Sequence, residues 1–316
     1  MSARSKIVVT GALGHIGSRL IRELPEKFPD AEILLLDDLS TQRYCSLFDL
    51  PSSGKFEFIE ADILTSDIAS LFAGARAVIH LAAITNAAGS FEIAEQVEKV
   101  NFKGTERVAE ACVTAGAALM FLSTTSVYGT QSDVVDEACP VSDLQPQSPY
   151  AESKLKSEQL LQRLATETGL RHVILRLGTI FGTSIGMRFH TAINKFCWQA
   201  VTGQPITVWR TALDQKRPYL DLTDCVAAIE FVLEQDLFDG AIYNVLTLNA
   251  TVREIVEVIK QHVEGVKIEY VDTRIMNQLS YTVLNERFAA HGFATKGSLP
   301  RGIADTIALL RGVHHR

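Results

Sequence analysis

The sequence predicts an α/β fold in which a doubly wound parallel sheet is joined to a smaller C-terminal α/β lobe. Short runs of β-branched and aliphatic residues alternate with helical patterns through the N-terminal part of the chain, which is typical of parallel strands joined by crossover helices. The first of these runs is followed by three regularly spaced glycines that open a helix. Together these features indicate a Rossmann-type sheet, in which ligands bind at the carboxyl ends of the strands.

Composition excludes several classes of function. The 316 residues are 47% hydrophobic and 21% charged, which is ordinary for a globular protein of one large domain or a domain with a lobe. The net charge is -7 and no Lys/Arg-rich run occurs, so we expect neither a nucleic-acid partner nor a membrane surface. The five cysteines lie far apart without a C-x-x-C motif, which indicates reduced thiols of a cytoplasmic protein and no metal site.

The first strand and helix flank a glycine-rich turn. Residues 7–9 form the β-branched run of a buried strand, and a helical pattern follows over residues 16–21. Gly11 permits the tight strand-to-helix turn, Gly14 lets the backbone approach a pyrophosphate, and Gly17 lets the helix pack close to the strand. The N–H groups at the helix N-terminus attract phosphates. The alternative is a structural turn without a ligand.

The second strand, over residues 32–36, ends at Asp37 and Asp38. An acidic residue about 20 positions past the glycines is placed to accept hydrogen bonds from the ribose diol of an adenosine. It also repels a 2′-phosphate, which favours NAD over NADP. Arg43 argues against this preference, because an arginine in this loop can hold the phosphate. The alternative for Asp37 is a solvated charge at a strand end.

Two further strands are predicted over residues 56–60 and 77–81. Asp62 follows the first of them and is placed to touch an adenine edge. Ala82 and Ala83 follow the second, where small side chains let a cofactor lie against the backbone.

A helix over residues 91–115 and a fifth strand over residues 118–122 come next. Asn101 lies within that helix, where a surface amide is the simplest interpretation. The fifth strand continues directly into four consecutive hydroxyl residues, Ser123–Ser126. We do not expect four hydroxyls at the carboxyl end of a strand to be there for packing.

The next helix carries a tyrosine and a lysine on one face. Ser148 and Pro149 open this helix, and Tyr150 and Lys154 follow in YAESK. Spacing of i, i+4 brings the phenol and the ammonium together. A neighbouring lysine favours phenolate and lowers the tyrosine pKa from about 10, which would make Tyr150 a general base. Taken alone, this pattern occurs commonly by chance.

Nine short blocks follow one another in a recognisable order. They are TGALGHIG, LDDL, ADI, HLAA, NFKGT, STTSVYG, SPYAESK, LRLGTIFG and KRPYLDLTD. The chain resembles the extended short-chain dehydrogenase/reductase superfamily over nearly its full length. Within it, the chain is most similar to the NAD-dependent nucleotide-sugar epimerase/dehydratase family, and looks most like the UDP-galactose and UDP-glucuronate 4-epimerases.

The resemblance implies catalytic and cofactor-binding roles. Tyr150 would be the base, Lys154 would hold the nicotinamide ribose, Thr124 would hydrogen-bond the reacting sugar hydroxyl with help from Ser126, and Asn101 would position the motif. The implied NAD site consists of residues at successive strand ends: Gly11, Gly14, His15, Ile16, Asp37, Asp38, Asp62, Ile63, Leu81, Ala82, Ala83, Asn101, Tyr150 and Lys154.

The family's substrate-binding residues match this chain less completely than its cofactor-binding residues do. Arg217 matches the family arginine that grips the nucleotide diphosphate, although it could be a surface arginine, and Thr125 could hydrogen-bond a sugar. Thr179 stands where the UDP-galactose enzymes have asparagine. The arginine that glucuronate epimerases carry after the next glycine is absent here, and Arg188 is a candidate replacement. His190 could equally be a structural histidine. The identity of the sugar and of the nucleotide base, with UDP the first choice, therefore stays open.

The resemblance divides the chain into residues 1–178, an NAD-binding domain that also takes sheet strands from about 218–245, and residues 179–316, mostly a substrate lobe. The pattern in the second part is less regular. It predicts strands over residues 171–177, 205–209 and 219–222, the last returning to the sheet, and helices over residues 187–201, from a Thr223-Asp224 cap toward Leu233, 251–263 and 303–310.

Three functions remain open on the sequence. The first is a 4-epimerase with tightly held NAD, in which Tyr150 removes the hydroxyl proton and hydride leaves and returns. The second is a net ketosugar reductase or dehydrogenase, and the third is a catalytically silent NAD-binding regulator. Thr125 and Ser126 replace the acid pair of related dehydratases and the glutamate of related decarboxylases, which argues against elimination.

A homodimer is also expected. The resemblance suggests it, and so does an apolar surplus on the helices beginning at Phe91 and Tyr150, where the second carries Leu155, Leu160, Leu161 and Leu164. Pairing with copies of themselves would bury these side chains.

Overall fold

The computed structural model describes residues 6–129, 133–271 and 280–313. Its centre is a seven-stranded parallel sheet in the order β11-β7-β5-β4-β1-β2-β3. The strands are β1 (Lys6–Thr10), β2 (Glu32–Asp37), β3 (Lys55–Glu60), β4 (Ala75–His80), β5 (Ala118–Thr124), β7 (His172–Leu177) and β11 (Ile242–Val245). The predicted Rossmann-type sheet is confirmed. The strand order reverses between β1 and β4, and ligands bind at such a switch point.

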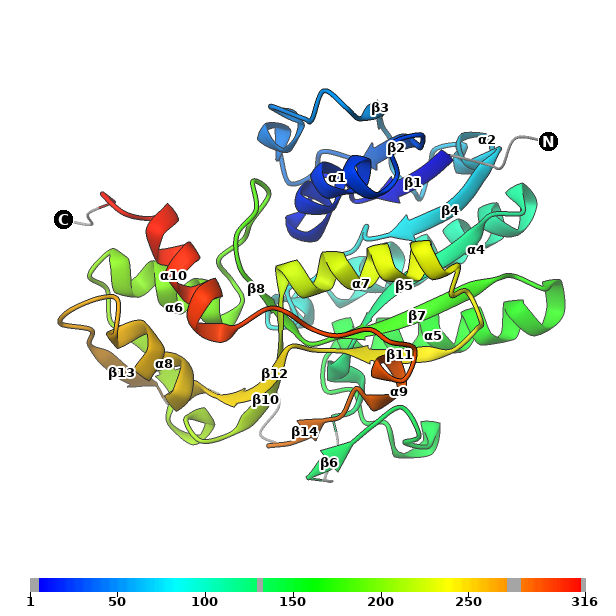
Figure 1. The fold of residues 1–316 in the computed structure, drawn as a ribbon. Coiled ribbons are helices and arrows are strands. Elements are labelled where there is room, and N and C mark those ends of the chain that lie inside the picture. Colours follow the sequence, from blue (N-terminus) through cyan, green and yellow to red (C-terminus); the bar gives the residue numbers. More distant parts are fainter. Residues whose placement is uncertain (1–5, 130–132, 272–279, 314–316) are drawn as a thin grey trace.

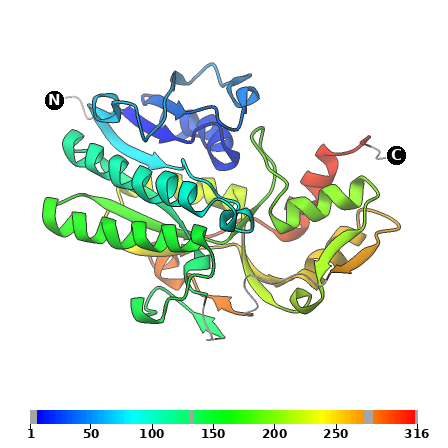
Figure 2. The ribbon, with the colours of Figure 1, turned by 180° about the vertical axis from the view of Figure 1, so that it is seen from behind.

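Helices cover both faces of this sheet (Figures 1 and 2). On one face, α1 (His15–Lys27) packs beside α7 (Leu222–Gln235). On the other lie α2 (Ile68–Phe72), α4 (Gly104–Ala115) and α5 (Pro149–Thr168). The apolar side chains of each sheet face form a separate core, one beneath α1 and α7 and one beneath the other three helices.

Local sequence sets the ends of the longest helix. The Ser148 hydroxyl accepts from the amide of Ala151, Pro149 takes the first position, and Gly169 ends α5 in the left-handed conformation. These residues orient Tyr150 and Lys154 toward the carboxyl edge of the sheet.

The predicted helix over residues 91–115 is confirmed from residue 94 onward, but its first half is not a regular α-helix. A 3₁₀ turn, η2 (Gly89–Phe91), precedes α3 (Ala94–Val97), and a π-helical segment, η3 (Glu98–Lys103), leads into α4. Short π segments are frequent at functional sites, and this one contains Asn101.

The C-terminal lobe has its own core. Its strands form a sheet of β12 (Leu248–Thr251), β10 (Lys216–Asp221) and β8 (Thr179–Phe181), and a pair of β13 (Ile268–Val271) and β9 (Ile206–Trp209). Its helices are α6 (Ala192–Val201), α8 (Val252–Lys260) and α10 (Leu299–Leu309). The remaining elements are η1 (Tyr44–Leu47), η4 (Thr125–Val127), β6 (Val134–Val135), η5 (Val141–Asp143), η6 (Arg210–Ala212), β14 (Thr282–Val283) and α9 (Glu286–Ala289).

Three expectations for this part need correction. Residues 219–222 do not return to the main sheet, because β10 pairs with β8 and β12, and β11 is the strand that completes that sheet. Helix α7 is capped by Asp221, whose carboxylate accepts from the amide of Thr223. Residues 187–191 are a loop, since Asn194 of α6 donates to the Arg188 carbonyl and holds the backbone there.

The leucines of α5 are already covered within one chain. Leu160 and Leu161 are buried, Leu164 packs against the core beneath α5, and Leu155 packs near Tyr128. The exposed face of α5 is polar, with residues such as Glu152, Lys156, Gln159 and Arg163. The apolar surplus that suggested a homodimer is therefore absent from this described helix.

Candidate active site

The glycine turn brings backbone close to backbone. Gly11 has a φ of +65°, and a Cβ there would lie 2.6 Å from the nitrogen of Ala82. At Gly17 a Cβ would lie 2.5 Å from the oxygen of Ala12, whereas at Gly14 its nearest neighbour would be 3.3 Å away. No side chain caps α1, so its first amides keep their donors for an anionic ligand.

Asp37 joins this turn to the second strand. One carboxylate oxygen accepts from the amide of Leu13 and the other from the amide of Leu39, each at 3.0 Å. Burial raises the pKa of Asp37, and these two bonds and Arg43 oppose the rise. Each oxygen keeps a lone pair, which a ribose diol could use. Asp38, by contrast, is exposed, and its Oδ1 accepts from Ser40.

The other predicted cofactor residues lie along the same edge. Half-buried positions are occupied by Gly14, Ile16, Asp62, Leu81, Ala82 and Ala83. Ile63 is buried in the core beneath α4, so its side chain serves packing. The Asp62 carboxylate accepts from the amide of Leu64 at 2.8 Å.

The loop after β8 crosses this turn, which the sequence did not indicate. The amide of Gly186 donates to the Ser18 hydroxyl at 2.9 Å, and a Cβ at Gly186 would lie 2.4 Å from the Leu13 oxygen. The Ser184 hydroxyl lies 3.0 Å from Nδ1 of His15. In both ribbon views this loop rises between α1 and α10.

Positive charge gathers beside the turn. Burial, with Arg188, Arg43 and His190 nearby, lowers the pKa of His15 to about 3. The pKa of His190 falls to about 4 for the same kind of reason. His15 Nε2 and Arg188 Nε are buried without a hydrogen-bond partner among the described residues, while Arg188 Nη1 donates to Thr85. An anionic group in this region would meet several cationic or neutral donors.

Tyr150 and Thr124 come together across the end of β5. A side-chain hydrogen bond links them, and this bond and the charge of Arg188 both lower the pKa of Tyr150. Burial has the larger, opposite effect, so the net pKa of Tyr150 is raised. The expected lowering of this pKa by Lys154 is therefore not found.

Lys154 turns toward the strand. Its ammonium donates to the carbonyl of Leu122 at 2.8 Å and lies 4.5 Å from the ring centroid of Phe121. Burial lowers the pKa of Lys154 to about 7, against an opposing effect of Glu158. The protonation of Lys154 is thus poised near neutral pH.

The four hydroxyls after β5 divide into two kinds. The Ser123 hydroxyl donates to Glu158 at 2.5 Å, and the Thr125 hydroxyl donates to the Leu177 carbonyl at 3.2 Å. Both residues are buried, so these two hydroxyls do serve the fold, and the geometry does not favour a substrate contact for Thr125. Thr124 accepts from the amide of Ser126 and keeps its contact with Tyr150, and Ser126 is half-buried.

Asn101 is buried rather than a surface amide. Its side chain accepts from the amide of Ile84 at 2.8 Å and donates to the Ile84 carbonyl at 2.9 Å. It also donates to the Ser153 hydroxyl at 3.2 Å, on the turn between Tyr150 and Lys154. These contacts tie α5 to the loop after β4, which is the geometry of a positioning residue.

A buried ion pair supports this region and was missed from the sequence. Arg176 of β7 donates to both carboxylate oxygens of Glu158, at 2.7 Å from Nη2 and 3.1 Å from Nε. The Arg176 guanidinium also lies 4.9 Å from the ring centroid of Tyr128, whose hydroxyl donates to Asn244. An arginine within the apolar strand VILRL and a glutamate one turn past Lys154 were the available signals.

Predicted substrate residues come from the lobe side. Thr179 is exposed at the start of β8, and Arg217 lies at the start of β10 over the ring of Tyr281 at 5.3 Å. The Tyr281 hydroxyl donates to the carbonyl of Thr125, which connects Arg217 to the end of β5. Arg188 also approaches from the lobe side, close enough to influence Tyr150.

The sequence profile of the NAD dependent epimerase/dehydratase family matches residues 7–245. The chain belongs to this family. The family is one of NAD-dependent epimerases and dehydratases, so the chain carries the fold and motifs of an NAD-dependent enzyme. No helix among the described residues has the length and apolar character needed to cross a membrane.

Its relatives within the family have diverse activities. The chain is 28% identical to the trifunctional UDP-glucose 4,6-dehydratase/UDP-4-keto-6-deoxy-D-glucose 3,5-epimerase/UDP-4-keto-L-rhamnose-reductase RHM1 of Arabidopsis thaliana, with 95% of this chain covered but only 46% of that protein. It thus spans about half the length of that relative. It is 30% identical to the dTDP-D-glucose 4,6-dehydratase of Mus musculus, covering 99% of this chain and 91% of the relative.

A solved structure is similar over the whole fold. The UDP-glucuronic acid 4-epimerase from Bacillus cereus, in complex with UDP-glucuronic acid and NAD, superposes with a TM-score of 0.84 at 26% identity, covering 96% of this chain and 99% of that one. NAD also fits the family member described here. Side chains are excluded at Gly11 and Gly17, Asp37 presents two anchored oxygens, and a buried nitrogen of His15 lacks a partner among the described residues.

Proposed function

We propose that this enzyme is a nucleotide-sugar 4-epimerase acting on a UDP-sugar. The observation that carries the proposal is the surroundings of Tyr150, where Thr124 supplies a hydrogen bond and Arg188 the charge that acts on the phenol. The two positions after Thr124 are Thr125 and Ser126, and neither carries a carboxylate. Elimination of water from a sugar needs a group able to take a carbon-bound proton, and hydroxyl side chains lack the driving force for it.

The residues divide the work of a reversible oxidation at C4. Bound NAD supplies the chemistry of accepting and returning a hydride. Tyr150 takes the proton of the reacting hydroxyl and gives it back, and Thr124 orients that hydroxyl. Lys154 holds the nicotinamide ribose, and Asn101 keeps α5 in register with the loop at Ile84.

The lobe would hold the rest of the substrate. Arg217 suits a diphosphate because a guanidinium can donate two parallel hydrogen bonds. Thr179 and Arg188 would contact the sugar, with His190 beside them. The Bacillus cereus epimerase was solved with UDP-glucuronic acid, which supports a UDP-sugar for this chain as well.

The test is product analysis after incubation with NAD and a panel of UDP-, dTDP-, GDP- and CDP-hexoses and -hexuronates. An unchanged mass with inverted C4, seen by NMR, is the expected result. A product lighter by water would show a dehydratase, as in the mouse relative, and a gain of two hydrogens that requires added reduced cofactor would show a reductase. Either of these two results would overturn the proposal.

A homodimer stays a prediction: the leucines of α5 are covered within the chain, whereas Phe91 and Ile93, which precede α3, are exposed. Sedimentation at micromolar concentration checks it, and a monomer there would contradict it.

A further inference from the structure

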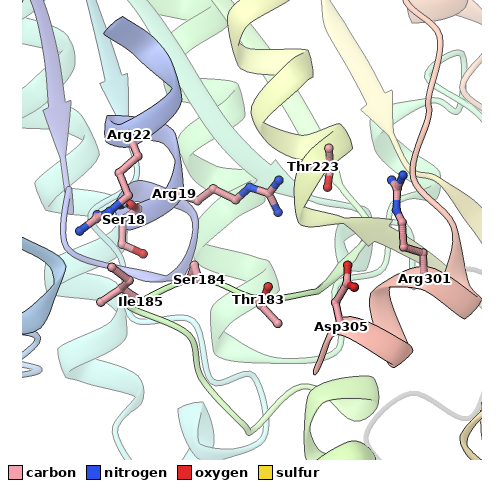
Figure 3. A pocket seen from close by; sticks show the side chains of 9 residues that line it. All are labelled: Ser18, Arg19, Arg22, Thr183, Ser184, Ile185, Thr223, Arg301 and Asp305. Carbon is pink, nitrogen blue, oxygen red and sulfur yellow. Dashed lines mark hydrogen bonds between the residues drawn. The ribbon is translucent and has the colours of Figure 1, made fainter. Parts of the chain in front are cut away.

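A cavity lies next to the glycine turn but is lined by other residues. It opens between α1, the first turn of α7 and α10, and the loop after β8 forms one wall (Figure 3). Its volume is about 490 Å³, within the range of small-molecule sites. It is lined by Ser18, Arg19, Arg22, Thr183, Ser184, Ile185, Thr223, Arg301 and Asp305. None of these residues belongs to the predicted NAD or substrate sites.

The wall of this cavity carries an excess of positive charge. Arg19 forms an ion pair with Glu23 at 2.6 Å. Within the described part of the chain, Arg22 donates only to the carbonyl oxygens of Ser18, Ser46 and Phe48, and Arg301 donates to the carbonyl of Lys296. A carbonyl oxygen carries no formal negative charge, so these hydrogen bonds leave the positive charges of Arg22 and Arg301 uncompensated.

The cavity brings arginine side chains together with a carboxylate and with threonine hydroxyls. Figure 3 shows Arg19 reaching from α1 toward Thr223, with Arg301 and Asp305 on the facing helix α10. Asp305 makes no ion pair with any residue in the described part of the chain. A guanidinium suits a phosphate, whereas a carboxylate and threonine hydroxyls suit the hydroxyls of a sugar.

We propose that this cavity binds a phosphorylated polyol, such as a hexose phosphate. Inorganic phosphate alone would leave Asp305 as a repulsive neighbour, and a nucleotide would find no aromatic side chain among the lining residues on which to stack its base. The site is independent of which reaction the enzyme catalyses.

The cavity is connected to the NAD site on two sides. Ser184 and Ile185 line it, while the adjacent Gly186 donates to Ser18 and packs on the glycine turn. On the other side Arg22 holds the carbonyl of Ser46, whose hydroxyl donates to the carbonyl of Leu13. A ligand that orders these residues therefore changes the affinity for NAD, and the coupling is reciprocal.

Calorimetric titration with glucose 6-phosphate, in saturating NAD and UDP, tests the binding site. Saturable binding of one molecule per chain is expected, with Arg301→Gln weakening it by about tenfold or more. Arg163→Gln is the matched control, because Arg163 is an exposed helical arginine four residues before an acid, Glu167, just as Arg301 is exposed and lies four residues before Asp305. Thermal melting of each variant confirms that it is folded.

A second variant separates phosphate recognition from sugar recognition. Asp305→Asn is expected to weaken glucose 6-phosphate while strengthening the binding of inorganic phosphate, since it removes a repulsive charge. The proposal is overturned by absence of saturable binding, by equal affinities in the native chain and the folded Arg301→Gln variant, or by parallel effects of Asp305→Asn on both ligands. These readouts are binding events, so they stand or fall separately from epimerase activity.

Coupling is measured by titrating NAD with and without glucose 6-phosphate. A change in NAD affinity of about fivefold or more is expected, with an equal factor for glucose 6-phosphate when NAD is present. Equal NAD affinity in both titrations would overturn the regulatory part of the proposal.

Discussion

Two buried glutamates lie on helices that pack on opposite faces of the sheet, and their surroundings differ. Glu158 of α5 is 2% exposed and accepts from the Ser123 hydroxyl and from Nε and Nη2 of Arg176. Glu230 of α7 is 7% exposed, and its Oε1 has no hydrogen-bond partner among the described residues. The two side chains are therefore buried to a similar extent but differ in whether their oxygens have hydrogen-bond partners.

The difference shows that pairing, rather than depth, decides what a buried carboxylate does for the fold. A buried charge with satisfied partners is held in one geometry, whereas a buried oxygen without a partner loses its hydration and gains nothing in return. The paired glutamate supports the helix that carries Tyr150 and Lys154. The unpaired one lies where α7 packs against α1, near Glu23, Glu26 and Glu234.

The largest expected effect is on catalysis by Tyr150, which lies on the same helix as the paired Glu158. Tyr150→Phe should lower turnover by about 10²–10⁴-fold, because a general acid–base group contributes that much. NAD affinity and melting temperature should stay near those of the native chain, since the proposed NAD site depends on the glycine turn, Asp37 and Lys154 rather than on the phenol oxygen. Retention of more than about a tenth of the activity would mean that another residue is the base.

Glu158→Gln tests the supporting ion pair itself. The variant leaves Arg176 buried without a counter-charge, which should lower the free energy of unfolding by about 3–5 kcal/mol. Denaturant unfolding measures the loss, and Glu152→Gln, on the exposed face of the same helix, is the control. A loss below about 1 kcal/mol, as for a surface pair, would show that the pairing does not matter.

Asp37 is intermediate between the two glutamates, because both oxygens are anchored yet each retains acceptor capacity. Asp37→Asn should weaken NAD binding by about tenfold to a hundredfold, the range for hydrogen bonds to a charged group. Asp38→Asn should change it little, since Asp38 serves the local turn at Ser40. Fluorescence titration checks both variants.

The same titration with NADP compares the two cofactors directly. The native chain should prefer NAD, because the Asp37 carboxylate would repel a 2′-phosphate. A clear preference for NADP would mean that Arg43 dominates this loop.

Local rules explain what could be predicted from the sequence. The strands, the glycine turn and the cap of α5 depend on residues close together in the chain, where hydrophobic period and backbone conformation determine structure. The glycine triplet at Gly11, Gly14 and Gly17 is of this kind, and so is the ordered series of motifs that indicated the family.

Contacts between distant segments explain what could not be predicted. The Ser123 and Thr125 hydroxyls serve the fold because their acceptors, Glu158 and the Leu177 carbonyl, lie on other elements. A glycine is likewise required at position 186, because a Cβ there would collide with the oxygen of Leu13, which is far away in sequence. The hydrophobic pattern of one segment contains no information about a hydrogen-bond acceptor that lies on another segment.

The smallest expected effect has the opposite sign to that of Glu158→Gln and completes the comparison. Burial, with Glu23 and other acids nearby, raises the pKa of Glu230 from its ordinary 4.5 to about 7, and Lys27 opposes the rise. Between these two values the folded state keeps a proton that the unfolded state has released. Stability should therefore fall as the pH rises through this window, and the penalty is complete above it.

Glu230→Gln mimics the protonated side chain and removes this penalty. The variant should match the native chain at about pH 4 and exceed its free energy of unfolding by about 1–2 kcal/mol at about pH 8. Denaturant unfolding at both values measures the difference, with the exposed neighbour Glu234→Gln as the control. A loss of stability at the higher pH would mean that the Glu230 carboxylate is stabilised after all, and that the two buried glutamates do not differ. Equal gains in the two variants would instead assign the effect to the general repulsion among the acids of α1 and α7, rather than to the buried oxygen.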